Sequence, residues 1–176
     1  MRIERENAIA VIVDYQEKLV PVMNEKDTLI HNSVILLEGL KTLGIPMIIT
    51  QQYTKGLGMT VEPIMTVAGT TEYIDKISFT AFDCVKEQLG DKKFVIVCGI
   101  ESHICVLQTV IDLSAAGYVP VLVADCISSR KESDKQVALE RARSEGAIVT
   151  TYESLLFELL KVAGTDTSKT IQRLIR

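Results

Sequence analysis

Apolar and polar positions along the chain follow two alternating patterns. Short uninterrupted apolar runs predict five strands, at residues 8–13, 47–50, 94–98, 119–124 and 147–150. Apolar residues at helical spacing predict helices over 30–43, from about 82 to 90, over 103–116, from 133 to 146, and from 150 to about 160. Strands that alternate with helices in this way are typical of an α/β fold whose parallel sheet is covered on both faces.

Two stretches lack a clear period. Residues 51–75 are predicted to form a long irregular loop, and such loops in compact domains are usually functional. The tail after Gly164 is polar and reads as an arm or a frayed end. With 176 residues, we expect a single domain over 1–176, with a core at about 6–160 and a C-terminal tail at 161–176.

In folds of this class, ligands bind at the carboxyl ends of the strands. Asp14 directly follows the first predicted strand, where it is either functional or a simple cap of the next turn. Cys105 lies in the first turn of a predicted helix, where the helix dipole favours thiolate and free backbone N–H groups can bind an oxyanion. The alternative is that Cys105 is a small buried hydrophobic residue.

Other candidates are weaker. Lys76 follows the irregular stretch, and most lysines are simply solvated. His103 lies two positions from Cys105, so the two side chains would not face each other in a helix, and we expect His103 to be peripheral. The stretch 55–58, Lys-Gly-Leu-Gly, lacks the spacing of a phosphate-binding loop and indicates a turn.

Composition excludes several classes. The net charge of −4 and the isoelectric point near 5.3 argue against a general nucleic-acid binder. No apolar run approaches the roughly 20 residues that span a bilayer, and the charged N-terminus does not resemble a signal peptide. Four cysteines without a CxxC pair indicate reduced thiols and a cytoplasmic protein, and two histidines are too few for a His-rich metal site.

Together, the motifs at the predicted strand ends resemble those of the isochorismatase-like cysteine hydrolases over roughly residues 6 to 160. They are Val13-Asp14-Tyr15-Gln16, the 52–58 stretch, Lys76 ahead of Phe79, the 99–109 stretch Gly-Ile-Glu-Ser-His-Ile-Cys-Val-Leu-Gln-Thr, and the 125–130 stretch Asp-Cys-Ile-Ser-Ser-Arg. The 99–109 stretch is highly specific. The 52–58 stretch is similar to the branch of uncharacterised isochorismatase-domain proteins.

The resemblance implies a three-layer α/β/α fold with a mostly parallel six-stranded sheet, whose sixth strand would lie within 60–78 or after 150. It implies a catalytic triad of Asp14, Lys76 and Cys105. It also implies a cis peptide between Ile100 and Glu101, which would aim the Glu101 N–H at the site beside that of Cys105. The substrate would form a thioester on Cys105, with Asp14 moving the proton and the two N–H groups holding the oxyanion.

Departures from the family narrow this expectation. True isochorismate hydrolases typically lack the cysteine, so Cys105 favours hydrolysis of a C–N or related acyl bond. Residues 51–75 contain no histidine, so a metal-dependent nicotinamidase is disfavoured and neither metal nor cofactor is expected. Lys55 could serve a substrate carboxylate, as carbamoylsarcosine-type enzymes require. Gln16, Tyr53, Phe79 and Phe82 flank the triad positions and are candidates for a substrate pocket.

The partners implied are a small-molecule substrate and other copies of the chain, as a dimer, tetramer or larger assembly, without nucleic acid or membrane. Three other functions stay open at this stage. The first is a catalytically silent member that binds a small molecule or a protein. The second is a thiol redox protein using Cys105, and the third is a flavodoxin-like nucleotide-binding domain, although the acidic stretch 14–17 would repel phosphate.

Overall fold

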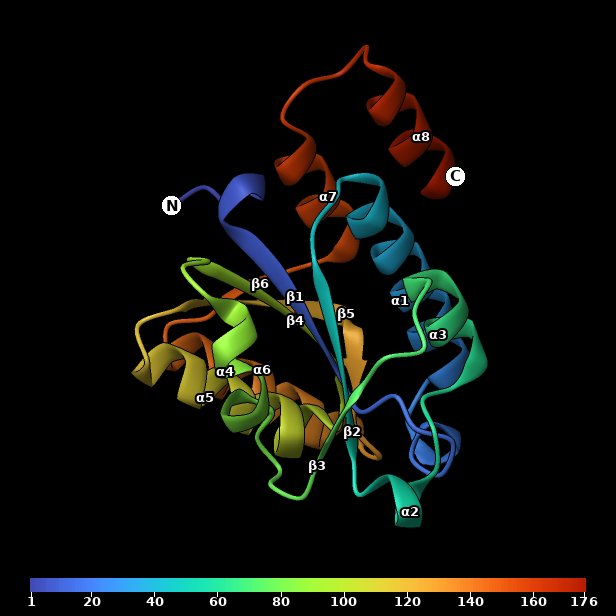
Figure 1. Cartoon of the computed structure of the whole chain (residues 1–176), viewed down its shortest axis with the longest axis vertical. Helices are drawn as coiled ribbons and strands as arrows, with labels where there is room; N and C mark the ends of the chain where they lie inside the picture. Colours follow the sequence, from blue (N-terminus) through green and yellow to red (C-terminus); the bar gives the residue numbers. More distant parts are fainter.

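Six parallel strands form one sheet in the order β3-β2-β1-β4-β5-β6. In this computed structural model, which describes residues 1–176, the strands are β1 (Ala8–Val13), β2 (Met47–Gln52), β3 (Ile74–Lys76), β4 (Phe94–Ile100), β5 (Val119–Ser128) and β6 (Ile148–Thr150). All of β1 and β4 is buried, because helices cover both faces of the sheet. The predicted three-layer α/β/α architecture is therefore confirmed (Figure 1).

The alternation of side chains along β1 divides the core into two parts. Ala8, Ala10 and Ile12 join the larger hydrophobic cluster on one face of the sheet. Ile9 and Val11 join the smaller cluster on the other face. A strand buried on both faces requires this continuous apolar run, which is why the sequence pattern locates β1 so clearly.

Eight α-helices accompany the sheet (Figure 1). They are α1 (Lys26–Thr42), α2 (Thr54–Leu57), α3 (Glu62–Ala68), α4 (Phe82–Leu89), α5 (Leu107–Ala115), α6 (Glu132–Ser144), α7 (Tyr152–Leu160) and α8 (Asp166–Leu174). Helices α3, α7 and α8 pack with α1 on one face, whereas α4, α5 and α6 lie on the other. None of the helices is long and apolar enough to cross a membrane.

Several expectations from the sequence need correction. Residues 51–75 are not a long loop, because they contain α2, α3 and the start of β3, and Ile64 of α3 is completely buried against the core. The sixth strand, β3, lies within 60–78. The tail is not a frayed end either, because α8 buries Ile171 in the core and Thr165 caps the helix by accepting a hydrogen bond from the Ser168 N–H.

Helix starts also differ from the prediction. Helix α7 begins at Tyr152 rather than at 150 and is capped by the Thr151 side chain, and α6 begins at Glu132 rather than at 133. The helix predicted over 103–116 begins as a π-helical turn, Ser102–Val106, that leads into α5. π-Helical turns are frequent at functional sites.

The order of the strands reverses between β1 and β4, at the centre of the sheet. From β1 the chain moves outward through β2 and β3, and from β4 it moves outward the other way through β5 and β6. Ligands in such sheets bind at the carboxyl ends of the strands where this order reverses. Gly99 allows the close approach of β1 and β4 there, because a Cβ at this position would lie 2.0 Å from the Val13 carbonyl oxygen.

Candidate active site

Asp14 occupies the carboxyl end of β1. It is completely buried and has a positive φ of 54°, a conformation that turns the chain sharply after the strand. Its carboxylate accepts two hydrogen bonds, one from the Thr50 hydroxyl at 2.8 Å and one from the Lys76 ammonium at 2.7 Å. Neighbouring strands β1, β2 and β3 therefore each contribute one group to this arrangement.

Lys76 ends β3 and is held on all sides. Besides Asp14, its ammonium donates to the Gln52 side-chain oxygen at 2.8 Å and to the Phe79 carbonyl at 2.9 Å, with the Ser78 carbonyl at 3.2 Å. Only 4% of the residue is exposed. A buried ammonium is tolerated only when it is paired and hydrogen-bonded in this way.

Cys105 lies in the π-helical turn after β4 and is 5% exposed. Burial raises the pKa of its thiol from 9.0 to about 12, and the negative charge of Asp14 adds to this effect. The Lys76 ammonium opposes it by lowering the pKa. The structure therefore favours a neutral thiol in the resting protein over the thiolate expected from the sequence, because burial outweighs the nearby positive charge.

Burial also raises the pKa of Asp14, while Lys76, Thr50 and Cys105 lower it. A buried neutral thiol thus lies beside a buried carboxylate that is held by an ammonium. This arrangement suits proton transfer from sulfur to carboxylate at the moment when sulfur attacks, because neither group must carry an isolated charge beforehand.

The turn that carries Cys105 has polar groups without partners. The peptide bond between Ile100 and Glu101 is cis. The Glu101 backbone N–H donates to no group of the protein, and neither does the completely buried hydroxyl of Ser102 have a hydrogen-bond partner. The Glu101 carboxylate accepts a hydrogen bond from the Arg130 Nε at 2.9 Å. Unpaired buried donors are costly in a protein, so two adjacent ones indicate a place where a ligand completes the hydrogen bonding.

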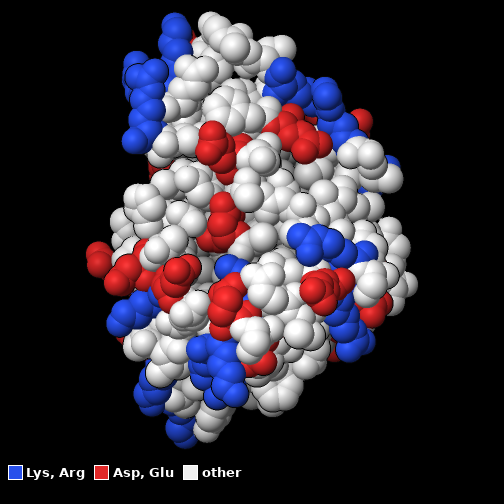
Figure 2. All heavy atoms as spheres, turned by 180° about the vertical axis from the view of Figure 1, so that it is seen from behind, with Lys and Arg blue, Asp and Glu red and all other residues white.

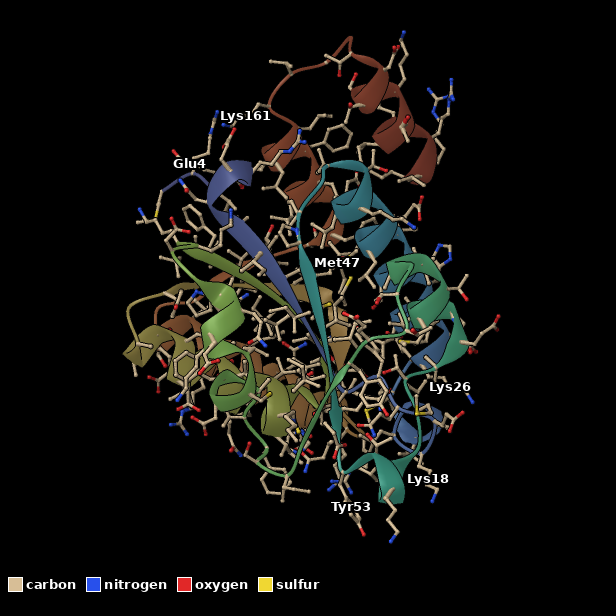
Figure 3. The ribbon with its side chains drawn as sticks, in the orientation of Figure 1. Glu4, Lys18, Lys26, Met47, Tyr53 and Lys161 are labelled. Atoms are coloured by element: carbon tan, nitrogen blue, oxygen red, sulfur yellow. The ribbon has the colours of Figure 1, made fainter.

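The four pocket candidates differ in their placement. Gln16 is completely buried, and its side-chain amide bonds to backbone groups of Gln52 and Gly58, so it acts as a structural brace between β1 and β2. Tyr53 is 50% exposed and projects away from the body of the protein (Figure 3). Phe79, 55% exposed, supplies the carbonyl that holds Lys76. The half-buried Phe82 packs edge-to-face on Tyr118.

His103 and the three other cysteines lie outside the predicted triad. His103 bonds the Ser129 hydroxyl through Nδ1 at 2.9 Å. Cys98 and Cys126 are buried in the core. Cys84 is half-buried, and burial raises the pKa of its thiol, whereas the charge of Lys76 lowers it. All four cysteines are free thiols.

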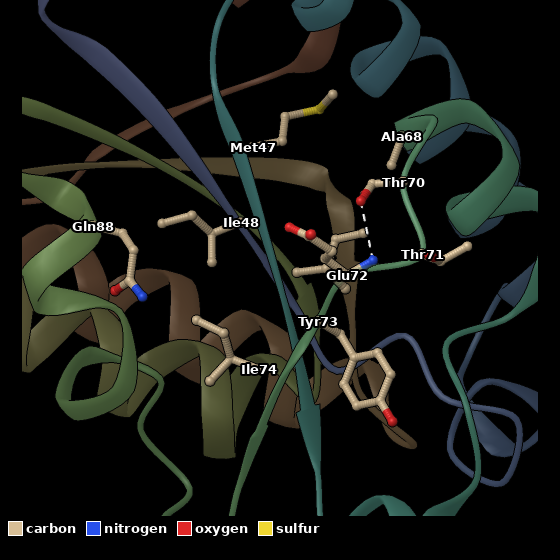
Figure 4. Close-up of a pocket in the computed structure, with 10 residues that line it drawn as sticks. Met47, Ile48, Ala68, Thr70, Thr71, Glu72, Tyr73, Ile74 and Gln88 are labelled. Carbon is tan, nitrogen blue, oxygen red and sulfur yellow. Dashed lines mark hydrogen bonds between the residues drawn. The ribbon is translucent and has the colours of Figure 1, made fainter.

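A cavity of about 630 Å³ lies elsewhere, at the outer edge of the sheet (Figure 4). It opens between the first half of β2, which β3 does not reach, and the segment 70–73, in which the Glu72 N–H donates to the Thr70 hydroxyl. None of the predicted site residues lines it. No group of three or more metal-ligating side chains is arranged to hold a metal ion.

Three residues of the site had no predicted role, although Gln52 and Arg130 lie within the motifs that carry the resemblance. Thr50 and Gln52 fix Asp14 and Lys76, and their position at the end of β2 was the available signal. Arg130 follows β5 and reaches back to Glu101, a contact that depends on the pairing of β4 with β5 at Ile100 and Ser128. Sequence spacing alone does not reveal that pairing.

Among protein families, the sequence model of the Isochorismatase domain matches residues 8–154 of the chain. These residues include the whole sheet and the three residues of the predicted triad. The chain belongs to the isochorismatase family. Its fold is accordingly that of the isochorismatase-like hydrolases.

Relatives within this family match along almost the entire chain. Isochorismatase domain-containing protein 2 of Danio rerio is 35% identical over 99% of this chain and 89% of its own length. The secreted isochorismatase effector Isc1 of Phytophthora sojae is 34% identical over 97% of this chain and 85% of its own. Among solved structures, the MAR1 ribonuclease of Caenorhabditis elegans superposes with a TM-score of 0.94 at 34% identity, covering 99% of this chain and 92% of that one.

Proposed function

We propose that this isochorismatase-family protein is a cofactor-free cysteine hydrolase that cleaves the C–N bond of a small amide or a related acyl compound. The observation that carries the proposal is the buried Asp14–Lys76 ion pair beside the Cys105 thiol, at the point where the strand order reverses. Such a constellation supplies a nucleophile, a proton acceptor and a fixed positive charge in one water-poor place.

In the first half-reaction, the Cys105 sulfur attacks the substrate carbonyl carbon while its proton passes to the Asp14 carboxylate. The negative charge moves to the carbonyl oxygen, which the backbone N–H groups of Glu101 and Cys105 bind. When this intermediate collapses, the C–N bond breaks and the leaving nitrogen takes the proton from Asp14. An acyl thioester on Cys105 and a free amine result.

In the second half-reaction, water attacks the thioester carbon and gives a proton to Asp14. The C–S bond then breaks, and the sulfur takes back the proton, which leaves a carboxylic acid and the resting thiol. Lys76 holds Asp14 in place and limits the cost of its charge throughout. No redox step and no co-reactant other than water are needed.

A second candidate function is the cleavage of RNA, because several structural neighbours at 27–34% identity are named MAR1 ribonucleases or putative ones. The charge distribution favours the amide instead. The chain has a net charge of −4, and Figure 2 shows positive and negative side chains interspersed over the face it displays. Binding of the phosphate backbone normally requires a basic face or stripe.

The test compares three proteins, the parent, Cys105→Ser and Cys84→Ser, on a panel of small amides. The parent should release amine and should carry an acyl group on Cys105 when acid-quenched samples are examined by peptide mass spectrometry. Cys105→Ser should lose both, whereas Cys84→Ser, which removes another free thiol that is half-buried, should keep both. A loss in both variants would mean that Cys84 is also required, and that Cys105 is not the specific nucleophile this proposal assigns.

The same three proteins should be tested on labelled RNA. RNA cleavage by the parent that disappears in Cys105→Ser, without any amide turnover, would overturn the amide proposal in favour of a ribonuclease. Folded protein that turns over neither substrate would favour the silent binding module. We also propose that the chain acts in the cytoplasm, since its four cysteines are free thiols. We further propose that it self-associates, since the structural neighbour YcaC of Escherichia coli is described as an octameric hydrolase.

A further inference from the structure

An ion pair joins the loop after β5 to the turn that carries Cys105. The Arg130 Nε lies 2.9 Å from a carboxylate oxygen of Glu101. The two ends of this pair lie in different surroundings, because the Glu101 side chain is 10% exposed and that of Arg130 is 58% exposed. Glu101 therefore has a nearly buried charge that is paired with this one arginine.

The Glu101 charge lies close to the nucleophile, because Glu101 directly precedes the turn that carries Cys105. Three charged groups influence the Cys105 thiol: Asp14 from β1, Lys76 from β3, and Glu101 at the end of β4. Asp14 and Glu101 both disfavour loss of the thiol proton, whereas Lys76 favours it. From α6, which packs against the same turn, Asp134 faces His103 at 4.0 Å.

Glu101 also supplies the backbone N–H that has no acceptor within the protein. Glu101 therefore contributes a charge through its side chain and a free N–H donor through its backbone. The contact with Arg130 compensates the charge and fixes the position of the residue. Exposed ion pairs usually contribute little to stability, so a pair with one buried member near a reacting group is better explained by its effect on that group.

We propose that Arg130 is a positioning residue, which holds and neutralises the Glu101 carboxylate beside the turn that carries Cys105, so that the Glu101 N–H stays directed at the substrate oxygen. This inference rests on the proposed function. Arg130 itself touches no reacting atom and acts only through Glu101.

The experiment measures the rate at which iodoacetamide alkylates Cys105 between pH 7 and pH 9.5, read by peptide mass spectrometry, so it needs no substrate. Arg130→Gln should slow alkylation at a fixed pH by about threefold, the effect of one uncompensated charge close to the thiol. Arg130→Lys should recover most of the rate. Arg141→Gln is the matched control, because Arg141 is equally exposed, at 58%, and also bonds a glutamate through Nε.

A second variant separates the charge from the fold. In Glu101→Gln/Arg130→Gln, the carboxylate is gone, and alkylation should return to at least the parent rate. Equal rates for Arg130→Gln and Arg141→Gln would overturn the proposal, as would a double variant as slow as Arg130→Gln. If Arg130→Gln does not fold, as judged by circular dichroism, the comparison of Glu101→Gln with the parent replaces it, and a rate that is not raised overturns the proposal.

The result stays separate from the proposed function. If the protein hydrolyses no amide but Arg130→Gln still slows alkylation, the role of Arg130 stands and the amide proposal fails. If an amide is found, Arg130→Gln should lower kcat and shift its pH profile upward with little change in KM. A rise in KM alone, restricted to anionic substrates, would instead make Arg130 a substrate-binding residue and contradict the proposal.

Discussion

The two sides of the candidate active site differ in whether their buried polar groups have hydrogen-bond partners within the protein. On the β1–β3 side, Asp14, Lys76 and Gln52 bond to one another and to the backbone, so their buried polar atoms find partners within the protein. On the β4 side, the Glu101 N–H and the Ser102 hydroxyl have no partner. On the β1–β3 side, the hydrogen bonding of the polar groups is complete within the protein. On the β4 side, two donors remain free to bond a ligand.

The difference explains how the two sides serve the proposed reaction. A charged base must be held in one position with its charge compensated, because burial of a charge is costly. Donors that stabilise an oxyanion must instead be free until the charge develops on the substrate. Gly99 brings these two sides together, since it lets β4 approach the end of β1.

The largest expected loss of stability comes from removing the Lys76 ammonium on the β1–β3 side. Lys76→Met leaves Asp14 as a buried carboxylate without its cation, at a cost of about 3–5 kcal/mol of unfolding free energy. Because Lys76 lowers the pKa of both Asp14 and Cys105, turnover and alkylation of Cys105 should both fall. Urea unfolding and iodoacetamide kinetics test this, and a variant as stable as the parent would show that the ion pair is not structurally required.

Substitution of Gly99, where β4 approaches the end of β1, should reduce stability nearly as much. Gly99→Ala places a methyl group against the Val13 carbonyl at a φ of 130°, so the strand ends must separate, at a cost of about 3 kcal/mol. Gly146→Ala, at a φ of 93° with no atom near the added methyl, is the control and should cost about 1 kcal/mol. Equal midpoints of unfolding for the two variants would refute the close approach.

Matched removal of one hydroxyl from each side should distinguish them directly. Thr50→Val takes a donor from the Asp14 carboxylate and should cost about 1–3 kcal/mol. Ser102→Ala removes a buried hydroxyl that bonds to nothing and should be neutral or stabilising. Thermal unfolding of the two variants beside the parent measures this difference, and a strongly destabilised Ser102→Ala protein would mean that its hydroxyl already has a partner.

The raised thiol pKa values should appear as a loss of stability in alkali. Burial raises the pKa of Cys98 and of Cys105 from 9.0 to about 12, so the unfolded chain releases these protons first. The unfolding free energy should therefore fall between pH 9 and pH 12, by about 1 kcal/mol per pH unit for each thiol. Cys105→Ser should have the shallower slope, and an unchanged slope would argue against the raised pKa.

Much of the fold could be predicted from the sequence because long buried strands and helices have clear periods. The strand β3 has three residues and α3 contains Pro63 near its start, so neither produced a recognisable pattern. Helix α8 has a single completely buried apolar residue, Ile171, among polar ones. Short elements depend on tertiary contacts that a sequence window does not contain.

The predicted triad residues do lie together, but their ionisation could not be predicted. Motif position identified Asp14, Lys76 and Cys105, whereas the state of the thiol depends on how far burial outweighs the Lys76 charge. Arg130 belongs to the 125–130 motif, but its role was not predicted, because its contact with Glu101 arises from strands that are adjacent in the sheet. The ionisation of the thiol and the contact between Arg130 and Glu101 both depend on distances in the folded structure.

The central claim is that Asp14 accepts the proton of a neutral Cys105 thiol, and Asp14→Asn tests it most directly through two readouts on one folded protein. Because the Asp14 charge raises the pKa of the thiol, its removal should speed alkylation of Cys105 at pH 8. Loss of the base should at the same time lower amide turnover by about 10²- to 10⁴-fold. Retained turnover, or alkylation that slows together with turnover, would contradict the account.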